Sequence, residues 1–351
     1  MKLRRTLLAV ALLAAAVAAA GGAWLYRDLA AFRDTPFGSD QEKVVEIAPG
    51  TSARQSLRLL ARAGAISSER RAWLYVRLLK RDRRPIRAGE YAFTGPLRPD
   101  EVLERLYRGE VKLYHFTVPE GLRMEEIAGI VQAAGLGKAR ELLSLMHDPA
   151  FAKELGVPFP NLEGYLYPDT YSFPRDPRPQ TILKTMVGRA RDEIHEAMAD
   201  LPAGLRLDER QGVTLASIIE KETGNPAERP RISCVFHNRL RLGMRLQTDP
   251  TVLYATMLRN GGRYPHNITR ADLLAPSRYN TYTVNGLPPG PIASPGAASL
   301  QAAFHPLACS DLYFVSRNDG THVFCPDLRC HERAVRRWQI EYFRARRTVA
   351  R

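Results

Sequence analysis

Residues 211–222 read QGVTLASIIEKE. Val213, Ala216 and Ile219 recur at helical spacing, so we predict an amphipathic helix over this stretch. The opposite face of that helix carries polar residues, namely Thr214, Ser217 and Lys221. Glu220 falls within the apolar arc, one turn after Ala216. The helix therefore presents one carboxylate on the side that faces a protein core.

Two interpretations of Glu220 follow from this position. Apolar neighbours make ionisation of a carboxyl group costly, so we expect the pKa of Glu220 to be raised. A general acid that works near neutral pH needs such an environment. Alternatively, Glu220 pairs with an arginine of the next helix, such as Arg231 or Arg239. Glu222 lies at the border of the apolar arc and is expected to make a surface or supporting contact.

Three further segments combine polar, aromatic and turn-forming residues. They read EGYLYPDTY at 163–171, RLQTDP at 245–250 and YNTY at 279–282. Loops of this kind hold many binding sites, and tyrosines beside carboxylates or amides suit sugars. The alternatives are a packed aromatic corner in the first segment and loop-stabilising side chains in the other two. The candidate sugar-binding residues are Glu163, Tyr165, Asp169, Gln247, Thr248, Asn280 and Tyr282.

Two proline-containing sites predict helix starts. Asp249 is expected to be an N-cap with Pro250 at the first helical position, which gives Asp249 a structural role. Ser294-Pro295 predicts the start of a helix that continues through Leu300 and Phe304.

The amino terminus carries a membrane signal. Basic residues precede an apolar stretch at 7–26, which is long enough to cross a bilayer as one helix. The alternative is a cleaved signal peptide, because Ala18 and Ala20 form a small-x-small pattern. We favour the uncleaved anchor, since the apolar stretch exceeds the usual signal-peptide core of about 7–15 residues. Either way, the rest of the chain is expected to be exported.

A strand-turn-helix pattern occurs twice. The first copy begins with the strand-like run at 44–47, and the second begins at 116–121. Gly50 and Gly64 bracket the first helix as Gly121 and Gly135 bracket the second. Such units resemble sugar-binding modules of the LysM type. The other predicted elements are a helical segment at 69–80, an extended segment at 89–93, a helix at 231–242, strands at 312–315 and 322–324, and a basic terminal helix with Trp338, Ile340 and Phe343. Together they indicate an α+β fold.

Charge and cysteine content limit the possible functions. The formal net charge is +14, which suits a membrane surface, an acidic polymer or nucleic acid. The basic residues form no stripe with interleaved aromatic residues, so we do not expect nucleic-acid binding. Of the four cysteines, Cys325 and Cys330 lie close in sequence, and a local disulfide or free thiols are favoured over a zinc site with His331. No metal or organic cofactor is expected.

The polar segments, taken together and in this order, resemble the endolytic murein transglycosylases, the MltG or YceG-like family. The likeness extends to GLPPGPI at 286–292, SPG at 294–296, His305-Pro306, LYFV at 312–315 and the stretch from His322 to His331. Cys325-Pro326 and Cys330 depart from the family pattern. The resemblance implies a cytoplasmic tail at 1–6, a membrane anchor at 7–26, a linker at 27–42, a LysM-like subdomain at 43–110 and a catalytic domain at 111–346.

The resemblance also implies an activity. In that family the catalytic glutamate is the first acid of the EKET motif, which corresponds to Glu220 here. The family also places the segments that contain Glu163 and Gln247 at the substrate cleft. The expected reaction cleaves the β-1,4 bond between N-acetylmuramic acid and N-acetylglucosamine and leaves a 1,6-anhydro end. The catalytic domain would be periplasmic, with wall-synthesis proteins as possible partners. Two alternatives remain open: a two-carboxylate muramidase that uses water, and a non-catalytic peptidoglycan-binding scaffold. A pyridoxal-phosphate lyase is not favoured, because neither a Schiff-base lysine nor a phosphate cradle is evident.

Overall fold

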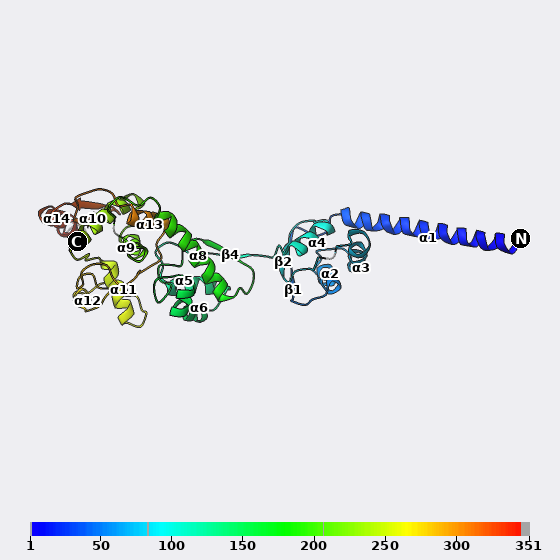
Figure 1. The fold of residues 1–351 in the computed structure, drawn as a ribbon, viewed down its shortest axis with the longest axis horizontal. Coiled ribbons are helices and arrows are strands. Elements are labelled where there is room, and N and C mark those ends of the chain that lie inside the picture. Colours follow the sequence, from blue (N-terminus) through cyan, green and yellow to red (C-terminus); the bar gives the residue numbers. More distant parts are fainter. Residues whose placement is uncertain (1, 83, 206, 345–351) are drawn as a thin grey trace. The chain divides into compact units, whose positions relative to one another are not determined.

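The computed structural model describes residues 2–82, 84–205 and 207–344 (Figure 1). The chain divides into two compact units, and each is described by itself. Unit 1 comprises Met1–Tyr114 with Phe173–Arg175, and unit 2 comprises His115–Ser172 with Asp176–Arg351. The mixture of helices and strands confirms the expected combination of both element types. Residue 1 of the predicted tail and the predicted domain end at 346 lie outside the described residues.

Unit 1 packs helices against a two-stranded antiparallel sheet in which Val45 pairs with Tyr91. Val45, Ile47 and Tyr91 are buried in its core with Leu57 of the following helix, because alternate strand residues face the helices. Its elements are α1 (Lys2–Asp34), β1 (Lys43–Ile47), α2 (Ala53–Arg62), α3 (Glu69–Leu74), the π-helix η1 (Tyr75–Lys80), β2 (Gly89–Phe93) and α4 (Pro99–Arg108).

Helix α1 is continuous through the predicted anchor and beyond it. Its stretch from Leu3 to Asp34 is long and apolar enough to cross a membrane. The first part of the predicted linker at 27–42 belongs to this helix, and its Leu29 and Phe32 are buried in the core of unit 1. Asp28 forms an ion pair with Arg71 of α3 at 3.0 Å. The last turns of α1 and the rest of unit 1 therefore form one folded body.

Unit 2 contains the elements that follow. β3 and β4 pair with each other, as do β5 and β6, and one end residue of β3 and of β4 belongs to unit 1. The elements are β3 (Tyr114–Thr117), α5 (Met124–Ala133), α6 (Ala139–Met146), α7 (Pro149–Glu154), β4 (Thr170–Phe173), α8 (Pro179–Ala197), α9 (Glu209–Glu222), the 3-10 helix η2 (Pro226–Glu228), α10 (Arg229–Arg241), α11 (Asp249–Arg259), α12 (Arg270–Leu274), α13 (Ala297–Phe304), β5 (Tyr313–Ser316), β6 (His322–Cys325), α14 (Leu328–Val335) and the π-helix η3 (Arg336–Glu341).

Helix α9 lies at the centre of unit 2 and is less amphipathic than its sequence predicts. Every residue from Gly212 to Ile219 is buried, including Thr214 and Ser217 of the expected polar face. Their hydroxyls are satisfied within the helix, because each donates to a backbone carbonyl, of Arg210 and Thr214 respectively, at 2.7 Å. Polar residues can therefore lie in the core without an unpaired group.

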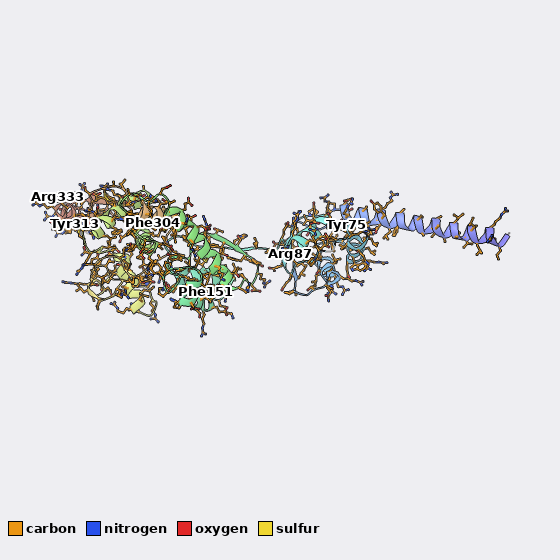
Figure 2. The ribbon with its side chains drawn as sticks, viewed as in Figure 1. Tyr75, Arg87, Phe151, Phe304, Tyr313 and Arg333 are labelled. Atoms are coloured by element: carbon orange, nitrogen blue, oxygen red, sulfur yellow. A yellow bond between two sulfur atoms is a disulfide. The ribbon has the colours of Figure 1, made fainter. Side chains whose placement is uncertain are left out.

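A close approach of two helices explains the glycine in α9. A Cβ on Gly212 would lie 2.0 Å from Cζ of Phe304, the fully buried aromatic residue at the end of α13 (Figure 2). Only glycine allows this contact between α9 and α13. Because α13 is held so close, its amino terminus reaches the carboxyl end of α9, where Glu220 lies.

The predicted helix starts are displaced by one or a few residues. The N-cap of α11 is Thr248 rather than Asp249, which is itself the first helical residue. α13 begins at Ala297 with Gly296 as N-cap, not at Ser294. In both cases the side chain expected to cap does not do so. Asp249 instead accepts a hydrogen bond from Tyr282.

Both strand-turn-helix copies are present. Gly50 and Gly64 have φ values of 81° and 75°, and Gly121 and Gly135 have 75° and 72°. These are left-handed conformations, which explains why glycine stands at all four turns. The repeat read from the sequence is confirmed as a backbone motif.

Candidate active site

Glu220 lies at the carboxyl end of α9, where two partners hold its carboxylate. Oε1 accepts a hydrogen bond from Nη2 of Arg229 at 2.9 Å, and Oε2 accepts one from the Gly296 N–H at 3.0 Å. The Glu220 side chain is only 5% exposed. The environment is therefore not the purely apolar one expected from the sequence. The ion pair anticipated in the alternative interpretation is present, although its partner is Arg229.

The two arginines named as alternatives have other roles. Arg231 pairs with Asp311 at 2.7 Å. Arg239 donates to the backbone carbonyls of Leu312 and Leu246, each at 2.7 Å. Neither is available to Glu220, because both guanidinium groups hold the segments around them.

Glu120 is a second carboxylate at this site, and sequence reasoning missed it together with Arg229. Glu120 Oε2 accepts from Nη2 of Arg229 at 3.2 Å, so one nitrogen serves both Glu120 and Glu220. The Arg229 side chain is 6% exposed and that of Glu120 is 48% exposed. The sequence signal that could have indicated Glu120 was the turn PEG at 119–121, of which the repeat pattern used only the glycine.

Backbone groups from three elements position these side chains. The Gly121 N–H donates to the Ser294 carbonyl at 2.9 Å, and the Gly121 carbonyl accepts from Nζ of Lys221 at 3.0 Å. The Ser294 N–H donates to the Leu122 carbonyl at 2.8 Å. The turn before α5, the segment before α13 and the end of α9 are thus bound to one another. Gly296 is also required by space, because a Cβ there would lie 1.9 Å from Oε1 of Glu120.

Glu163 is buried next to α5 and not exposed to a ligand. It accepts from the Met124 N–H at 3.3 Å and from the Tyr254 hydroxyl at 3.2 Å. Burial, followed by the charge of Glu125, raises the pKa of Glu163 to about 8, and the hydrogen bond from Tyr254 opposes this shift. Glu163 therefore connects the start of α5 to α11 as a largely protonated carboxyl at neutral pH.

The predicted residues Gln247 and Thr248 lie where the chain enters α11. Gln247 is exposed and has φ 51°, an uncommon conformation for a residue other than glycine. The Thr248 N–H donates to Oγ1 of Thr281 at 3.0 Å, whereas Oγ1 of Thr248 is buried and has no hydrogen-bond partner among the described residues. Gln247 is therefore open to solvent, whereas the Thr248 hydroxyl is enclosed.

Tyr282 lies within electrostatic reach of the end of α9. Its hydroxyl donates to Asp249 Oδ1 at 2.7 Å. Burial, followed by the charge of Asp249, raises the pKa of Glu222 to about 8, with Arg239 opposing. Glu222 in turn contributes to the raised pKa of Tyr282, after burial and Asp249. The Tyr282 and Asp249 side chains thus lie near Glu222, which follows Glu220 by two residues on α9.

The remaining three predicted binding residues have structural contacts. Tyr165 is fully buried and donates to Glu209 at 2.8 Å, at the opposite end of α9 from Glu220. Asn280 is buried, and its amide donates to three backbone carbonyls at the end of α12, the shortest bond being 2.8 Å to Ala275. Asp169 is exposed and pairs with Arg189 at 3.3 Å. Among the described residues, the structure brings none of these three to the Glu220 carboxylate.

Two disulfides stabilise the surroundings of the site. Cys325 and Cys330 are bonded, in agreement with the local disulfide favoured from the sequence. Cys234 and Cys309 are also bonded, which the sequence did not indicate. Cys234 lies on α10, the helix that begins with Arg229. The second disulfide therefore fixes α10 to the segment that follows α13.

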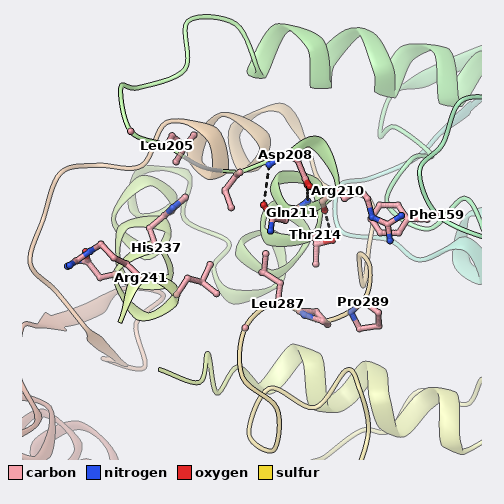
Figure 3. Close-up of a pocket in the computed structure, with 16 residues that line it drawn as sticks. Phe159, Leu205, Asp208, Arg210, Gln211, Thr214, His237, Arg241, Leu287 and Pro289 are labelled. Carbon is pink, nitrogen blue, oxygen red and sulfur yellow. Dashed lines mark hydrogen bonds between the residues drawn. The ribbon is translucent and has the colours of Figure 1, made fainter. Parts of the chain in front are cut away.

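A cavity of about 900 Å³ lies elsewhere in unit 2 (Figure 3). It is lined by the first turns of α9, including Asp208 and Gln211, by His237 of α10 and by the loop residues Leu287 and Pro289. None of the predicted site residues lines it. Asp208 and Glu220 are about 18 Å apart along a helix with a rise of 1.5 Å per residue. We therefore place the candidate chemistry at Glu220 and not in this cavity.

Comparisons with known proteins agree with the motif resemblance. The sequence profile of the YceG-like family matches residues 45–337. An endolytic murein transglycosylase of Bacillus subtilis (strain 168) is 31% identical over 337 residues, which cover 91% of this chain and 90% of that protein. One of Streptococcus pneumoniae (serotype 2, strain D39) is 28% identical over 282 residues, 71% of this chain and 50% of that protein.

A solved structure shows a similar fold. The crystal structure of a yceG-like protein from Listeria monocytogenes is 31% identical, with a TM-score of 0.55, and the match covers 84% of this chain and 99% of that one. The profile match over most of the sequence and the similarity to the Bacillus subtilis protein lead to one conclusion. The chain belongs to the YceG-like family.

Proposed function

We propose that this protein is an endolytic murein transglycosylase in which Glu220 is the catalytic acid and base. The observation that carries the proposal is the Glu220 carboxylate, nearly buried and held by Arg229 and the Gly296 N–H, in a chain related over most of its length to proteins of that name. A positioned carboxyl group of this kind can transfer a proton in both directions during one turnover.

In the proposed reaction, protonated Glu220 gives its proton to the oxygen of the β-1,4 bond between N-acetylmuramic acid and N-acetylglucosamine. The bond from C1 to that oxygen breaks and leaves an oxocarbenium-like muramic acid. The C6 hydroxyl of the same sugar then bonds to C1 and returns its proton to Glu220. The products are a 1,6-anhydro end and a free N-acetylglucosamine end, and no water is consumed. Cleavage within nascent strands would terminate their elongation.

Gln247, Thr248 and Tyr282 are the predicted substrate-binding residues that the geometry supports. Gln247 is exposed in a left-handed conformation, and the Thr248 hydroxyl has a free hydrogen-bonding position among the described residues. Glu163 and Asn280 would act by holding the loops, because both side chains are buried and engaged. A fixed scaffold under an exposed binding loop is a common arrangement for sugar sites.

The proposed location is the inner membrane, with the amino terminus cytoplasmic and unit 2 in the periplasm. The basic residues Arg4 and Arg5 before the apolar stretch support this orientation. Unit 1, with its β1-turn-α2 motif, would act as a LysM-like module that contacts glycan strands. Peptidoglycan is thus the proposed partner of both units, and wall-synthesis proteins would be found beside it.

A muramidase that uses water is the second candidate, and Glu120 is the observation that favours it. Its oxygen and that of Glu220 contact the same Arg229 nitrogen, so the two carboxyl groups lie close together. Paired carboxylates are the usual arrangement in glycosidases that use water or a covalent intermediate. The two candidates differ in their products, since hydrolysis adds one water to the reducing end.

The test uses the purified full-length chain in detergent with nascent, uncrosslinked glycan strands. Mass spectrometry of the released fragments should show anhydro ends, one water lighter than hydrolysed ends. Glu220→Gln should reduce the rate by about 10²–10⁴-fold, whereas Glu196→Gln, an exposed carboxylate on α8, should leave it unchanged. Hydrolysed ends would favour the muramidase. Absence of any cleavage by the wild-type protein would favour a binding scaffold.

A further inference from the structure

Arg229 must keep a counter-charge while Glu220 changes protonation state. Its guanidinium is almost completely buried, and a buried charge without a partner is strongly destabilising. When Glu220 is ionised, it supplies that charge itself. When Glu220 carries a proton, as a general acid must, the Arg229 nitrogen needs another carboxylate.

Glu120 is placed to be that carboxylate. It reaches Nη2 of Arg229 at 3.2 Å, from a turn fixed to both α9 and the segment before α13. Gly296 leaves the space that the Glu120 carboxylate occupies. Glu228, adjacent to Arg229 in sequence, does not compete, because its carboxylate accepts from the ring and the N–H of His322 at 2.8 and 2.9 Å.

We propose that Glu120 is a positioning residue that acts through Arg229: it supplies the counter-charge of the buried guanidinium while Glu220 carries the proton that it donates. This proposal rests on the function proposed above. The positive charge of Arg229 acts on both carboxylates, and the negative charge of Glu120 offsets part of its effect on Glu220. This offset favours the protonated state that donates to the glycosidic oxygen.

The other charges around Glu220 do not replace this arrangement. Lys221 follows Glu220 on α9, but its ammonium group donates to the Gly121 carbonyl. The amino terminus of α13 presents the Gly296 N–H, which favours the ionised form of a carboxyl group. Tyr167 is within electrostatic range of Glu120 but has no ionic charge below its raised pKa. Glu120 is thus the carboxylate, among the described residues, that shares the Arg229 nitrogen with Glu220.

The main test is the pH profile of cleavage by Glu120→Gln. Without the Glu120 charge, Glu220 loses its proton more readily, so the alkaline limb of kcat should move to lower pH by about one unit. The expected shift lies at the low end of the range for neighbouring charges because Glu120 is half exposed to solvent. KM should change little. Glu120→Asp retains the charge, so its alkaline limb should lie close to that of the wild-type protein.

The matched control is Glu141→Gln, which removes a surface carboxylate paired with Lys138 on α6. It changes the net charge equally and should leave the limb in place. A Glu120→Gln profile that is only scaled down, with both limbs unmoved, would show a purely structural role and overturn the proposal. Equal inactivity of Glu120→Gln and Glu120→Asp at every pH would also overturn it, because Glu120 would then take part in the chemistry directly.

A second measurement does not depend on activity. In protein labelled with ¹³C at glutamate carboxyl groups, the signal missing from Glu220→Gln identifies Glu220. Its titration midpoint should be lower in Glu120→Gln than in wild type, and equal midpoints would overturn the proposal. If wild-type protein cleaves no glycan, the proposed function fails, while this comparison still decides the role of Glu120.

Discussion

The two strand-turn-helix copies have the same backbone and different surroundings. In both, an alternate pair of residues in or directly after the strand is buried, Val45 with Ile47 and Phe116 with Val118. The N-cap N–H of each helix donates to the side chain three residues on, from Ser52 to Gln55 and from Arg123 to Glu126. Local sequence therefore produces the same unit twice.

The difference lies in what touches the turn. A Cβ on Gly50 would meet no atom within 4 Å, whereas one on Gly121 would lie 3.4 Å from Cγ of Glu220 and 3.5 Å from Cδ of Lys221. The residue before Gly121 is Glu120, which binds Arg229, while the residue before Gly50 is a proline. A repeated local motif thus becomes part of a candidate site only where another helix packs on its turn.

The largest expected difference in stability between the two copies comes from loss of the disulfide that fixes α10. Cys234 and Cys309 are 75 residues apart in sequence, and a loop of that length contributes about 4 kcal/mol to the free energy of unfolding. Replacing both by serine should destabilise the second copy by about that amount. The first copy should be unaffected, because unit 1 contains no cysteine. Hydrogen exchange of peptides from 43–64 and 114–135 measures the protection of the first and of the second copy, respectively.

The matched variant is Cys325→Ser with Cys330→Ser, whose loop spans five residues and should contribute only about 2 kcal/mol. Equal losses of protection in the two copies would contradict the separate stabilisation of unit 2.

A second contrast is the buried acid beside the second copy. Glu163 has a pKa of about 8 in the folded protein, whereas a glutamate in the unfolded chain ionises near 4.3. Between these values unfolding releases a proton, so stability falls as pH rises from about 4.3 to 8. Glu163→Gln cannot ionise, and its melting temperature should fall less steeply over this range.

Melting temperatures of wild type and Glu163→Gln at intervals from pH 5 to 8 test this expectation. Glu222 titrates in both proteins and does not affect the difference between them. Parallel curves would show that Glu163 is ionised in the folded state.

The smallest expected effect is on stability at the two turn glycines. Alanine in a left-handed conformation costs about 1 kcal/mol, so Gly50→Ala and Gly121→Ala should lower the free energy of unfolding similarly. Activity should separate them. The new methyl group of Gly121→Ala would lie at van der Waals distance from Cγ of Glu220, and the strained turn should displace that side chain by less than 1 Å, so we expect a loss of activity of roughly tenfold or less. Urea unfolding and glycan cleavage give the two values, and equal activities would show that the turn at Gly121 does not position Glu220.

Periodicity and glycine placement in the sequence were sufficient to predict much of this fold. The spacing at 211–222 gave α9, and the glycine brackets gave both copies of the repeat. The strands at 313–316 and 322–325 follow the predicted ones closely. These features depend on neighbours within a few residues, which sequence patterns report directly.

The partners of Glu220 could not be predicted in this way. Arg229, Arg231 and Arg239 all lie on α10, and which of them meets Glu220 depends on how α10 packs against α9. Burial of Thr214 and Ser217 similarly depends on helices that surround α9 from distant parts of the chain. The left-handed conformation of Gln247 and the Thr248 hydroxyl, which has no hydrogen-bond partner in the part of the chain that the structure describes, are likewise properties of tertiary packing.

The continuity of α1 has a mechanical consequence for unit 1. Leu29 and Phe32 lie within two turns of the end of the predicted span and are already part of the folded core. Any tilt or rotation that a bilayer imposes on this helix would be transmitted rigidly to β1, α2 and the turn at Gly50. If the apolar part of α1 spans a bilayer, as proposed, the orientation of unit 1 relative to the membrane would be set by the tilt and rotation of this helix.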